Sequence, residues 1–269
     1  MADSLTFIGN ATTLLRLGPF TLLTDPNFLH RGQRAYLGKG LTSKRLTEPA
    51  MTPEELPPLD AIVLSHLHGD HWDRVAQRRL PHTTPVVTTE HAARRLRGRA
   101  GFRNAVGLDT WQSRELTKDD SRLRITSMPG RHALGFLQRL LPPVMGSLLE
   151  LTNESGEVTL RLYITGDTLY HENLREVVRR HPDVHTCVLH LGGTTLPGGF
   201  VVTMDGRQGA QLLELVGPRQ AVPVHYDDYE AFKSPLEDFR TEVGARGLGH
   251  LVSYVERGAT IPLAHAVRE

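Results

Sequence analysis

The stretch Ser65-His66-Leu67-His68-Gly69-Asp70-His71-Trp72-Asp73 follows a short apolar run and precedes a segment with a helical pattern. Side chains on an extended chain repeat every two residues, so His66 and His68 point the same way. Gly69 permits a sharp turn that can return Asp70 and His71 to the same point. Unpaired imidazoles and a carboxylate packed so closely would be poorly satisfied without a ligand. We therefore expect this stretch to bind metal at the end of a buried strand.

Composition places the chain among folded globular proteins. It has 269 residues, of which 39% are apolar and 23% charged. No linker divides it, so we expect a single domain over residues 1–269. A formal net charge of +1 excludes a strongly basic nucleic-acid binder on bulk charge. With 14 histidines and one cysteine, Cys187, metal ligands are expected from histidine and carboxylate side chains.

The N-terminal sequence does not resemble a targeting segment. Residues 1–5 contain an acidic residue and no basic region, so they do not predict a signal peptide. The most apolar stretch, residues 134–151, contains Arg139, Pro142 and Pro143, which do not fit a membrane span. The expected location is the cytoplasm.

Both ends of the chain mix strand and helix patterns, whereas the middle is mostly strand. Residues 5–24 predict an antiparallel pair that turns at Gly18-Pro19, and residues 30–58 predict a long surface loop. Further strands are predicted at 61–64, 85–88, 102–106, 113–116, 123–127, 147–151, 158–164, 186–189, 220–224 and 251–255. Helices are predicted at 73–80, 90–97 (with Gly98 as C-cap), 171–180, 207–215 and 236–244. Two packed mixed sheets with helices on both outer faces, an α/β fold, accommodate this order.

The pattern H-x-H-x-D-H in His66-Leu67-His68-Gly69-Asp70-His71 resembles the signature of the metallo-β-lactamase superfamily. The resemblance extends over essentially the whole chain and implies a four-layer αββα sandwich. It also implies three further ligands, in a fixed order, each beyond a strand. The sequence supplies His132 after Met128-Pro129-Gly130-Arg131, Asp167 after Tyr163-Ile164-Thr165-Gly166, and His225 after Val222-Pro223-Val224.

The same resemblance implies a site for two divalent metal ions. The first ion would be held by His66, His68 and His132, the second by Asp70, His71 and His225, and Asp167 would bridge them. Nitrogen and oxygen ligands suit zinc, and manganese or iron are compatible with the same set. A hydroxide between two cations is available as a nucleophile near pH 7. Asp70 is the expected catalytic residue, which would orient this hydroxide and accept its proton.

The expected reaction is hydrolysis of a small-molecule ester, lactone or phosphodiester. True β-lactamases often have cysteine where this chain has Asp167. Residues 7–15, 22–26 and 223–229 resemble the branch that contains ascorbate-phosphate lactonases and N-acyl-phosphatidylethanolamine phospholipase D enzymes. Many members of that branch have histidine where this chain has Asn10. A homo-oligomer is compatible with the sequence.

Three other functions remain open at this point. An RNA-processing nuclease can share the fold and signature, and Arg94, Arg95, Arg97, Arg99 and Arg103 form a local basic run. We interpret that run as a solvated helix face, so nucleic acid is not the expected partner. A di-iron oxidoreductase is the second alternative, because the same ligands can hold iron. A non-catalytic domain is the third, and the complete ligand set argues against it.

Some residues near the predicted ligands carry weaker signals. Asp25 could orient a ligand imidazole, or it could be a turn residue before Pro26. His190 follows a strand-like run and precedes a glycine pair, so it is a candidate pocket residue. The apolar stretch 133–145 directly follows His132 and could form either a substrate wall or ordinary core.

Overall fold

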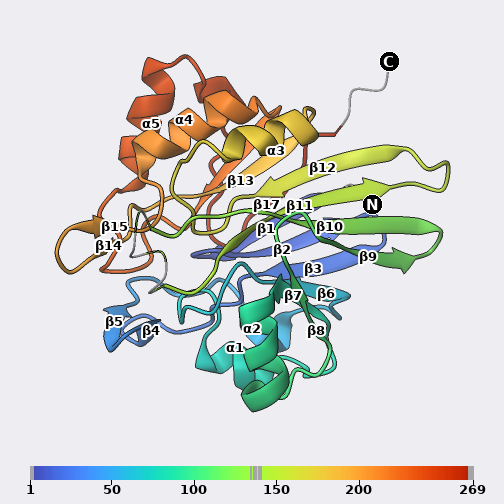
Figure 1. The fold of residues 1–269 in the computed structure, drawn as a ribbon, viewed down its shortest axis with the longest axis horizontal. Coiled ribbons are helices and arrows are strands. Elements are labelled where there is room, and N and C mark those ends of the chain that lie inside the picture. The colour runs from blue at the N-terminus through green and yellow to red at the C-terminus, as the bar shows by residue number, and fades with distance from the viewer. Residues whose placement is uncertain (1–2, 134, 136–137, 139–140, 266–269) are drawn as a thin grey trace.

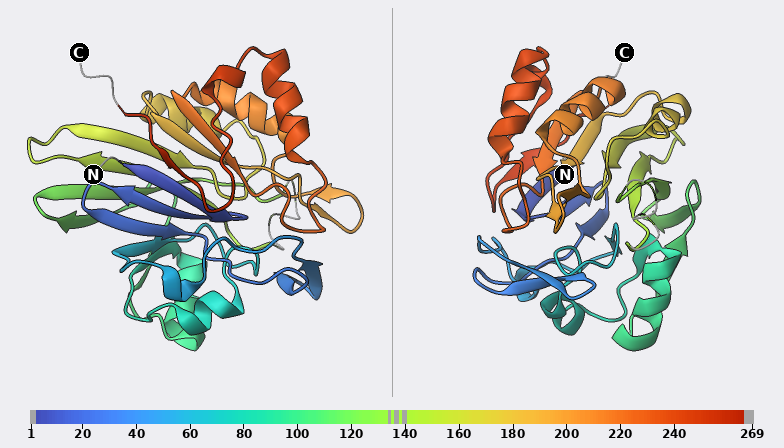
Figure 2. Two further views of the ribbon diagram at one scale, coloured as in Figure 1. Left: turned by 180° about the vertical axis from the view of Figure 1, so that it is seen from behind. Right: turned by 60° about the vertical axis from the view of Figure 1, so that its left-hand side comes forward.

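Two β-sheets pack face to face, and helices cover both outer faces (Figures 1 and 2). The computed structural model describes residues 3–265 except 134, 136–137 and 139–140. One hydrophobic cluster lies between the sheets and includes Leu22 and Val87 from one sheet and Leu149 and Val222 from the other. Two further clusters lie under the helices on either side. The chain therefore has the four-layer α/β architecture of the metallo-β-lactamase fold.

The first sheet has seven strands in the order β17-β1-β2-β3-β6-β7-β8. Their bounds are Thr260–Pro262, Ser4–Gly9, Thr12–Leu17, Phe20–Thr24, Ala61–Val63, Val86–Thr89 and Ala105–Leu108. Strands β3, β6, β7 and β8 run parallel to one another, and the remaining pairs are antiparallel. The two central parallel strands, β6 and β7, are buried along their whole length, as expected for a sheet covered on both faces.

The second sheet has six strands in the order β16-β13-β12-β11-β10-β9. Their bounds are Gln220–Val224, Thr186–His190, Val158–Ile164, Met145–Thr152, Ser121–Pro129 and Ser113–Lys118. Strands β12, β13 and β16 are parallel, whereas β9 to β12 form an antiparallel meander. Strand β10 therefore runs in the same direction as β12, because both pair antiparallel with β11.

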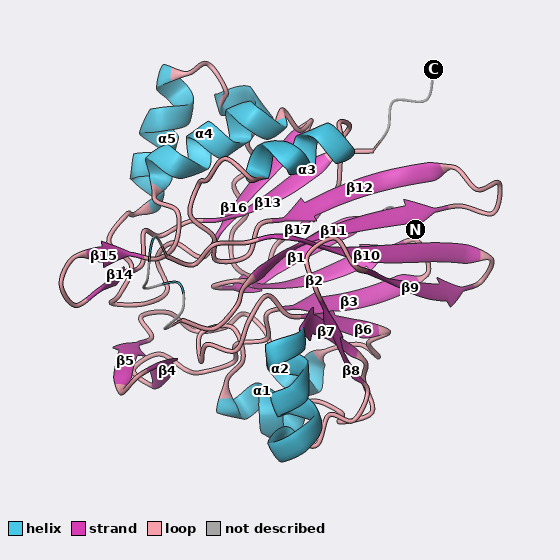
Figure 3. Ribbon diagram, in the orientation of Figure 1, coloured by secondary structure: helices cyan, strands magenta, loops and turns pink. Residues whose placement is uncertain are grey.

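The helices divide between the two outer faces, as Figure 3 shows. Helices α1 (Arg74–Arg79) and α2 (Glu90–Arg95) cover the first sheet, and α2 continues as the π-helical turn η2 (Leu96–Ala100). Helices α3 (Leu174–Arg180), α4 (Gly206–Val216) and α5 (Leu236–Ala245) cover the second. Short 3-10 turns lie at η1 (Pro53–Glu55) and η4 (Gly249–Leu251). No helix in the described part of the chain is long and apolar enough to cross a membrane.

Aspartates begin two of these helices. The Asp73 carboxylate accepts hydrogen bonds from the backbone N–H groups of Val75 and Ala76 at the start of α1. Asp205 accepts one from the N–H of Gln208 at the start of α4. These bonds satisfy N–H groups that have no partner inside the helix.

The structure corrects four of the predicted elements. The first 24 residues form three strands, because the chain reverses at Gly9 and Asn10, where φ is +140° and +55°. Helix α2 continues past Gly98, and its π-helical extension ends at Gly101, which has a φ of +78°. The strand predicted at 102–106 begins only at Ala105. The strand predicted at 251–255 is a single bridge between Val252 and Ala221, and the last strand is β17.

The predicted loop over residues 30–58 contains a hairpin, formed by β4 (Arg34–Gly38) and β5 (Leu41–Lys44). This hairpin packs against the histidine-rich stretch, where the N–H of Gly69 donates to the Tyr36 carbonyl over 2.8 Å. A Cβ atom on Gly69 would lie 2.6 Å from the Tyr36 nitrogen and 2.8 Å from its oxygen. Only glycine permits this approach of the two backbones.

The substitution Gly69→Ala should therefore destabilise the protein by about 1–3 kcal/mol, because the hairpin must move away from the added methyl group. Thermal unfolding after treatment with a chelator measures this effect without a contribution from bound metal. Gly244→Ala in α5 is the matched control, since its Cβ would meet nothing within 4 Å. An unchanged melting temperature for Gly69→Ala would contradict the close approach.

Candidate metal centre

The carboxyl ends of strands from both sheets carry the predicted ligands. His66, His68, Asp70 and His71 follow β6 of the first sheet. In the second sheet, His132 follows β10, Asp167 follows β12 and His225 follows β16. Strands that run in one direction end at the same edge of their sheet, so these residues meet there. The structure thus brings together side chains that are up to 159 positions apart, as the separation of His66 and His225 shows (225 − 66).

One cluster consists of His66, His68 and His132, all of them buried. The Nε2 atom of His66 lies 2.9 Å from Nδ1 of His68, and Nε2 of His132 lies 3.1 Å from the same Nδ1. Three imidazole nitrogens that converge so closely cannot all carry protons. Burial and the neighbouring imidazoles hold the pKa of His66 well below its usual range, and they lower that of His68 to about 3. The rings are therefore neutral, the form in which imidazole binds a metal ion.

The second cluster consists of Asp70, His71, Asp167 and His225. The Nε2 atom of His71 lies 3.3 Å from Asp167 Oδ2, and Nε2 of His225 lies 3.4 Å from Asp70 Oδ2. The two Nε2 atoms are 3.1 Å apart. Asp167 also acts electrostatically on His66 of the first cluster, where it raises the pKa of that imidazole against the larger effect of burial.

Charges of opposite sign balance one another in the second cluster. Burial raises the pKa of Asp167, but His225 and His71 outweigh it, so the net pKa lies well below its usual range. Burial lowers the pKa of His71, yet the carboxylates of Asp167, Asp70 and Asp25 raise it well above the ordinary value. Among the described residues, the Oδ1 atoms of Asp70 and Asp167 are buried without a hydrogen-bond partner. Buried anionic oxygens of this kind suit a divalent cation.

Most of the ligand imidazoles are oriented by a hydrogen bond at Nδ1. His132 Nδ1 lies 2.7 Å from the Val202 carbonyl, and His225 Nδ1 lies 3.0 Å from the Leu191 carbonyl. The Nδ1 atom of His66 lies 3.0 Å from the Ser65 hydroxyl. These contacts direct Nε2 into the centre, as is usual for metal-binding histidines. His68 is reversed and presents Nδ1.

Asp25 lies behind His71, at the end of β3. Its Oδ2 atom is 2.9 Å from His71 Nδ1, and its Oδ1 accepts the N–H of Ser65 over 2.7 Å. Burial raises the pKa of Asp25, but His71 and His190 more than compensate and lower it to about 2. Asp25 therefore contacts the imidazole of a predicted ligand, whereas the alternative interpretation made it a simple turn residue before Pro26.

His190, the last residue of β13, also lies at this carboxylate. Its Nε2 atom is 3.4 Å from Asp25 Oδ2, and its ring is fully buried and stacked against His71 at 6.0 Å. Asp25, His71 and His190 are close enough together to form a third group of potential ligands. His190 thus lies beside Asp25 and His71 and is fully buried.

Sequence reasoning missed three residues that position the ligands. The side-chain amide of Asn10 donates to the Asp70 backbone carbonyl over 2.6 Å, and the backbone carbonyl of Asn10 accepts the N–H of His225. The amide of Asn27 donates to the Gly69 carbonyl over 3.0 Å. Thr203 donates to Asp167 Oδ2 over 2.9 Å. For Asn10 alone, the sequence held a sign of a role near the site, because many members of the branch that this chain resembles have histidine at that position.

Backbone strain accompanies this positioning. Asn10, Asp25 and His225 all adopt positive φ angles, of +55°, +35° and +60°. Left-handed conformations of this kind are costly for residues other than glycine, and they persist where the surrounding contacts impose them. All three residues belong to the hydrogen-bond network around the clusters.

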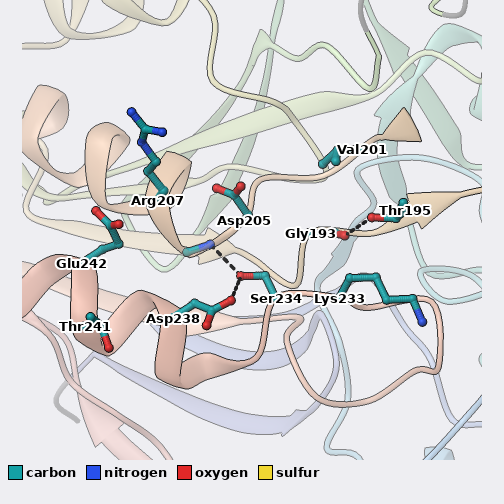
Figure 4. Close-up of a pocket in the computed structure, with 11 residues that line it drawn as sticks. Gly193, Thr195, Val201, Asp205, Arg207, Lys233, Ser234, Asp238, Thr241 and Glu242 are labelled. Atoms are coloured by element: carbon teal, nitrogen blue, oxygen red, sulfur yellow. Dashed lines mark hydrogen bonds between the residues drawn. The ribbon is translucent and has the colours of Figure 1, made fainter. Parts of the chain in front are cut away.

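A polar cavity of about 400 Å³ lies beside the segment that carries Thr203, between α4, α5 and the loop after β13 (Figure 4). Within it, the Ser234 hydroxyl accepts the N–H of Gly206 and donates to Asp238. The N–H of Ser234 donates to the Gly192 carbonyl, which ties this loop to the start of α5. Ser234 thereby fixes the chain at two points, Gly192 shortly after His190 and Gly206 shortly after Thr203.

The apolar stretch 133–145 falls partly outside the described residues, which omit 134, 136–137 and 139–140. Its role as a substrate wall stays a prediction.

Comparison with known proteins identifies the family to which this chain belongs. A metal-dependent hydrolase of Deinococcus radiodurans is 27% identical over 249 residues, which cover 90% of this chain and 92% of that protein. The crystal structure of a possible metal-dependent hydrolase from Veillonella parvula has the same fold, with a TM-score of 0.82 and 21% identity over 98% of this chain and 100% of that one. So does that of an isothiocyanate hydrolase from Delia radicum gut bacteria, with a TM-score of 0.81 and 22% identity over 97% of this chain and 99% of that one. Residues 21–226, more than half of the chain, match the model of the beta-lactamase superfamily domain. The chain therefore belongs to the beta-lactamase superfamily.

Proposed function

We propose that this protein is a metal-dependent hydrolase that holds two divalent ions. The first ion would be bound by His66, His68 and His132, and the second by Asp70, His71 and His225. The observation that carries the proposal is the pair of adjacent buried clusters, whose nitrogen and oxygen atoms lie within 4.8 Å of one another in each. Asp167 belongs to the second cluster and acts electrostatically on His66 of the first, and it would bridge the ions.

Two bound divalent ions lower the pKa of a water molecule between them and stabilise negative charge on the substrate. The chain's own residues hold the donor atoms in place. Thr203 donates to Oδ2 of Asp167, whereas Oδ1 has no hydrogen-bond partner among the described residues and lies 3.6 Å from His225 Nε2. Asp70 likewise has an unpartnered Oδ1, which can accept a hydrogen bond, and then a proton, from the attacking water.

Zinc fits this set of imidazole and carboxylate donors, and manganese or iron would fit as well. A carboxylate at position 167, in place of a thiolate, supports an ester, lactone or phosphodiester as the substrate. The structural similarity to an isothiocyanate hydrolase adds isothiocyanates to the compounds worth testing. An RNA substrate finds less support, because Arg94 and Arg97 of the basic run face Glu90, at 3.9 Å and 3.1 Å.

Purified protein should hydrolyse at least one compound in a panel of phosphodiesters, lactones, esters and isothiocyanates. Removal of metal with a chelator should abolish the activity, and added zinc, manganese or iron should restore it. Elemental analysis of the same samples identifies the metal. Activity that survives complete removal of metal would contradict the proposal. Bound iron with an oxidative product would favour the di-iron oxidoreductase instead.

Asp167→Asn should lower the metal content from about two ions per chain to about one, because the amide keeps the shape of the side chain but loses its charge. Elemental analysis against protein concentration measures the ratio. Asp120→Asn is the matched control, since Asp120 is exposed in the turn between β9 and β10. Two ions in the Asp167 variant would show that this carboxylate is not a bridge.

A further inference from the structure

A cavity of about 370 Å³ lies behind the histidine-rich stretch, between the β4–β5 hairpin and helices α1 and α2. Leu67, Gly69 and Trp72 line this cavity, whereas His66, His68 and His71 belong to the metal clusters. The stretch therefore has two faces. One face carries the ligands, and the other forms a wall of a separate space whose size is within the range of small-molecule sites.

Apolar side chains form much of the inner wall of this cavity. Leu29 and Leu96 are each 1% exposed and line it together with Leu67 and Ala100. Trp72 is 6% exposed, and its indole nitrogen has no hydrogen-bond partner among the described residues. A buried N–H group without a partner is destabilising, and most such groups in proteins are paired.

Arginines from three elements surround the mouth of the cavity. Arg34 of β4, Arg74 of α1 and Arg95 of α2 line it and are exposed. In the described part of the chain, none of the three forms an ion pair with a carboxylate; Arg34 bonds to Thr42, and Arg74 to the Arg34 carbonyl.

The carboxylate of Asp73, which lines the cavity, makes no ion pair with these arginines among the described residues. Backbone groups occupy both of its oxygens. Oδ1 accepts the N–H groups of Val75 and Ala76, and Oδ2 accepts those of Phe28 and Leu29. The cavity of Figure 4 is more acidic, because Asp205, Asp238 and Glu242 line it together with Arg207 and Lys233.

We propose that the cavity behind the metal-ligand stretch is a second binding site, which takes a small amphiphilic anion. The carboxylate or phosphate group would lie among Arg34, Arg74 and Arg95, and a short hydrocarbon or aryl group would contact the apolar wall. Arginine is suited to this role, because its planar guanidinium pairs with carboxylate and phosphate oxygens. The site depends neither on bound metal nor on catalytic activity.

Octyl phosphate is a suitable probe for isothermal titration calorimetry with the full-length, metal-loaded protein. We expect saturable binding of one molecule per chain, and at least tenfold weaker binding of inorganic phosphate and of octanol. Arg95→Gln should weaken octyl phosphate binding at least tenfold. Arg94→Gln, the neighbouring exposed arginine that faces Glu90, should leave it unchanged. In a Trp111→Phe background, the remaining Trp72 fluorescence should change on titration.

Several results would overturn the proposal. Equal weakening by both arginine variants would indicate general charge attraction. Equal binding of inorganic phosphate or of octanol would show that one half of the site contributes nothing. Binding to phosphatidylglycerol vesicles without binding of monomeric octyl phosphate would indicate a membrane surface in place of a site for a free molecule. Absence of any binding at millimolar concentration would exclude the site directly, whether or not the protein is a hydrolase.

Discussion

The buried carboxylate of Asp25 is the group on which the arrangement of the metal centre depends. Asp25 itself follows β3. Its carboxylate contacts Ser65 and His71, which follow β6, and lies 3.4 Å from Nε2 of His190, the last residue of β13. Strand β13 belongs to the second sheet, so this one carboxylate connects the two halves of the sandwich. Its low pKa keeps it charged, and a charged acceptor fixes the orientation of the His71 ring.

Burial makes such connections necessary. The seven predicted ligands lie in a region from which water is almost excluded, where each polar atom needs a partner or a cation. Asn10 and Asn27 hold the predicted ligand segment through the backbone carbonyls of Asp70 and Gly69, and Thr203 donates to the Asp167 carboxylate itself. The positive φ angles at Asn10, Asp25 and His225 are the conformational cost of that arrangement.

The sequence predicted features that depend on residues close together in the chain, and it predicted fewer of those that depend on contacts between segments far apart. The spacing of His66, His68, Asp70 and His71 is a local pattern, and most strands and helices could be predicted from apolar periodicity. The β4–β5 hairpin could not, because its glycine-rich stretch has no alternating pattern and it is held by the backbone of Gly69. The positions of Asn27 and Thr203 beside the ligands likewise depend on the packing of distant segments, which no local pattern reports.

An X-ray anomalous difference map recorded at the absorption edge of the bound metal would show directly whether two ions occupy the two clusters. We expect two peaks, roughly 3.5–4 Å apart. One should lie about 2.0–2.2 Å from His66 Nε2, His68 Nδ1 and His132 Nε2, and the other at that distance from His71 Nε2 and His225 Nε2. Peaks elsewhere, or a single peak in fully loaded protein, would contradict this expectation.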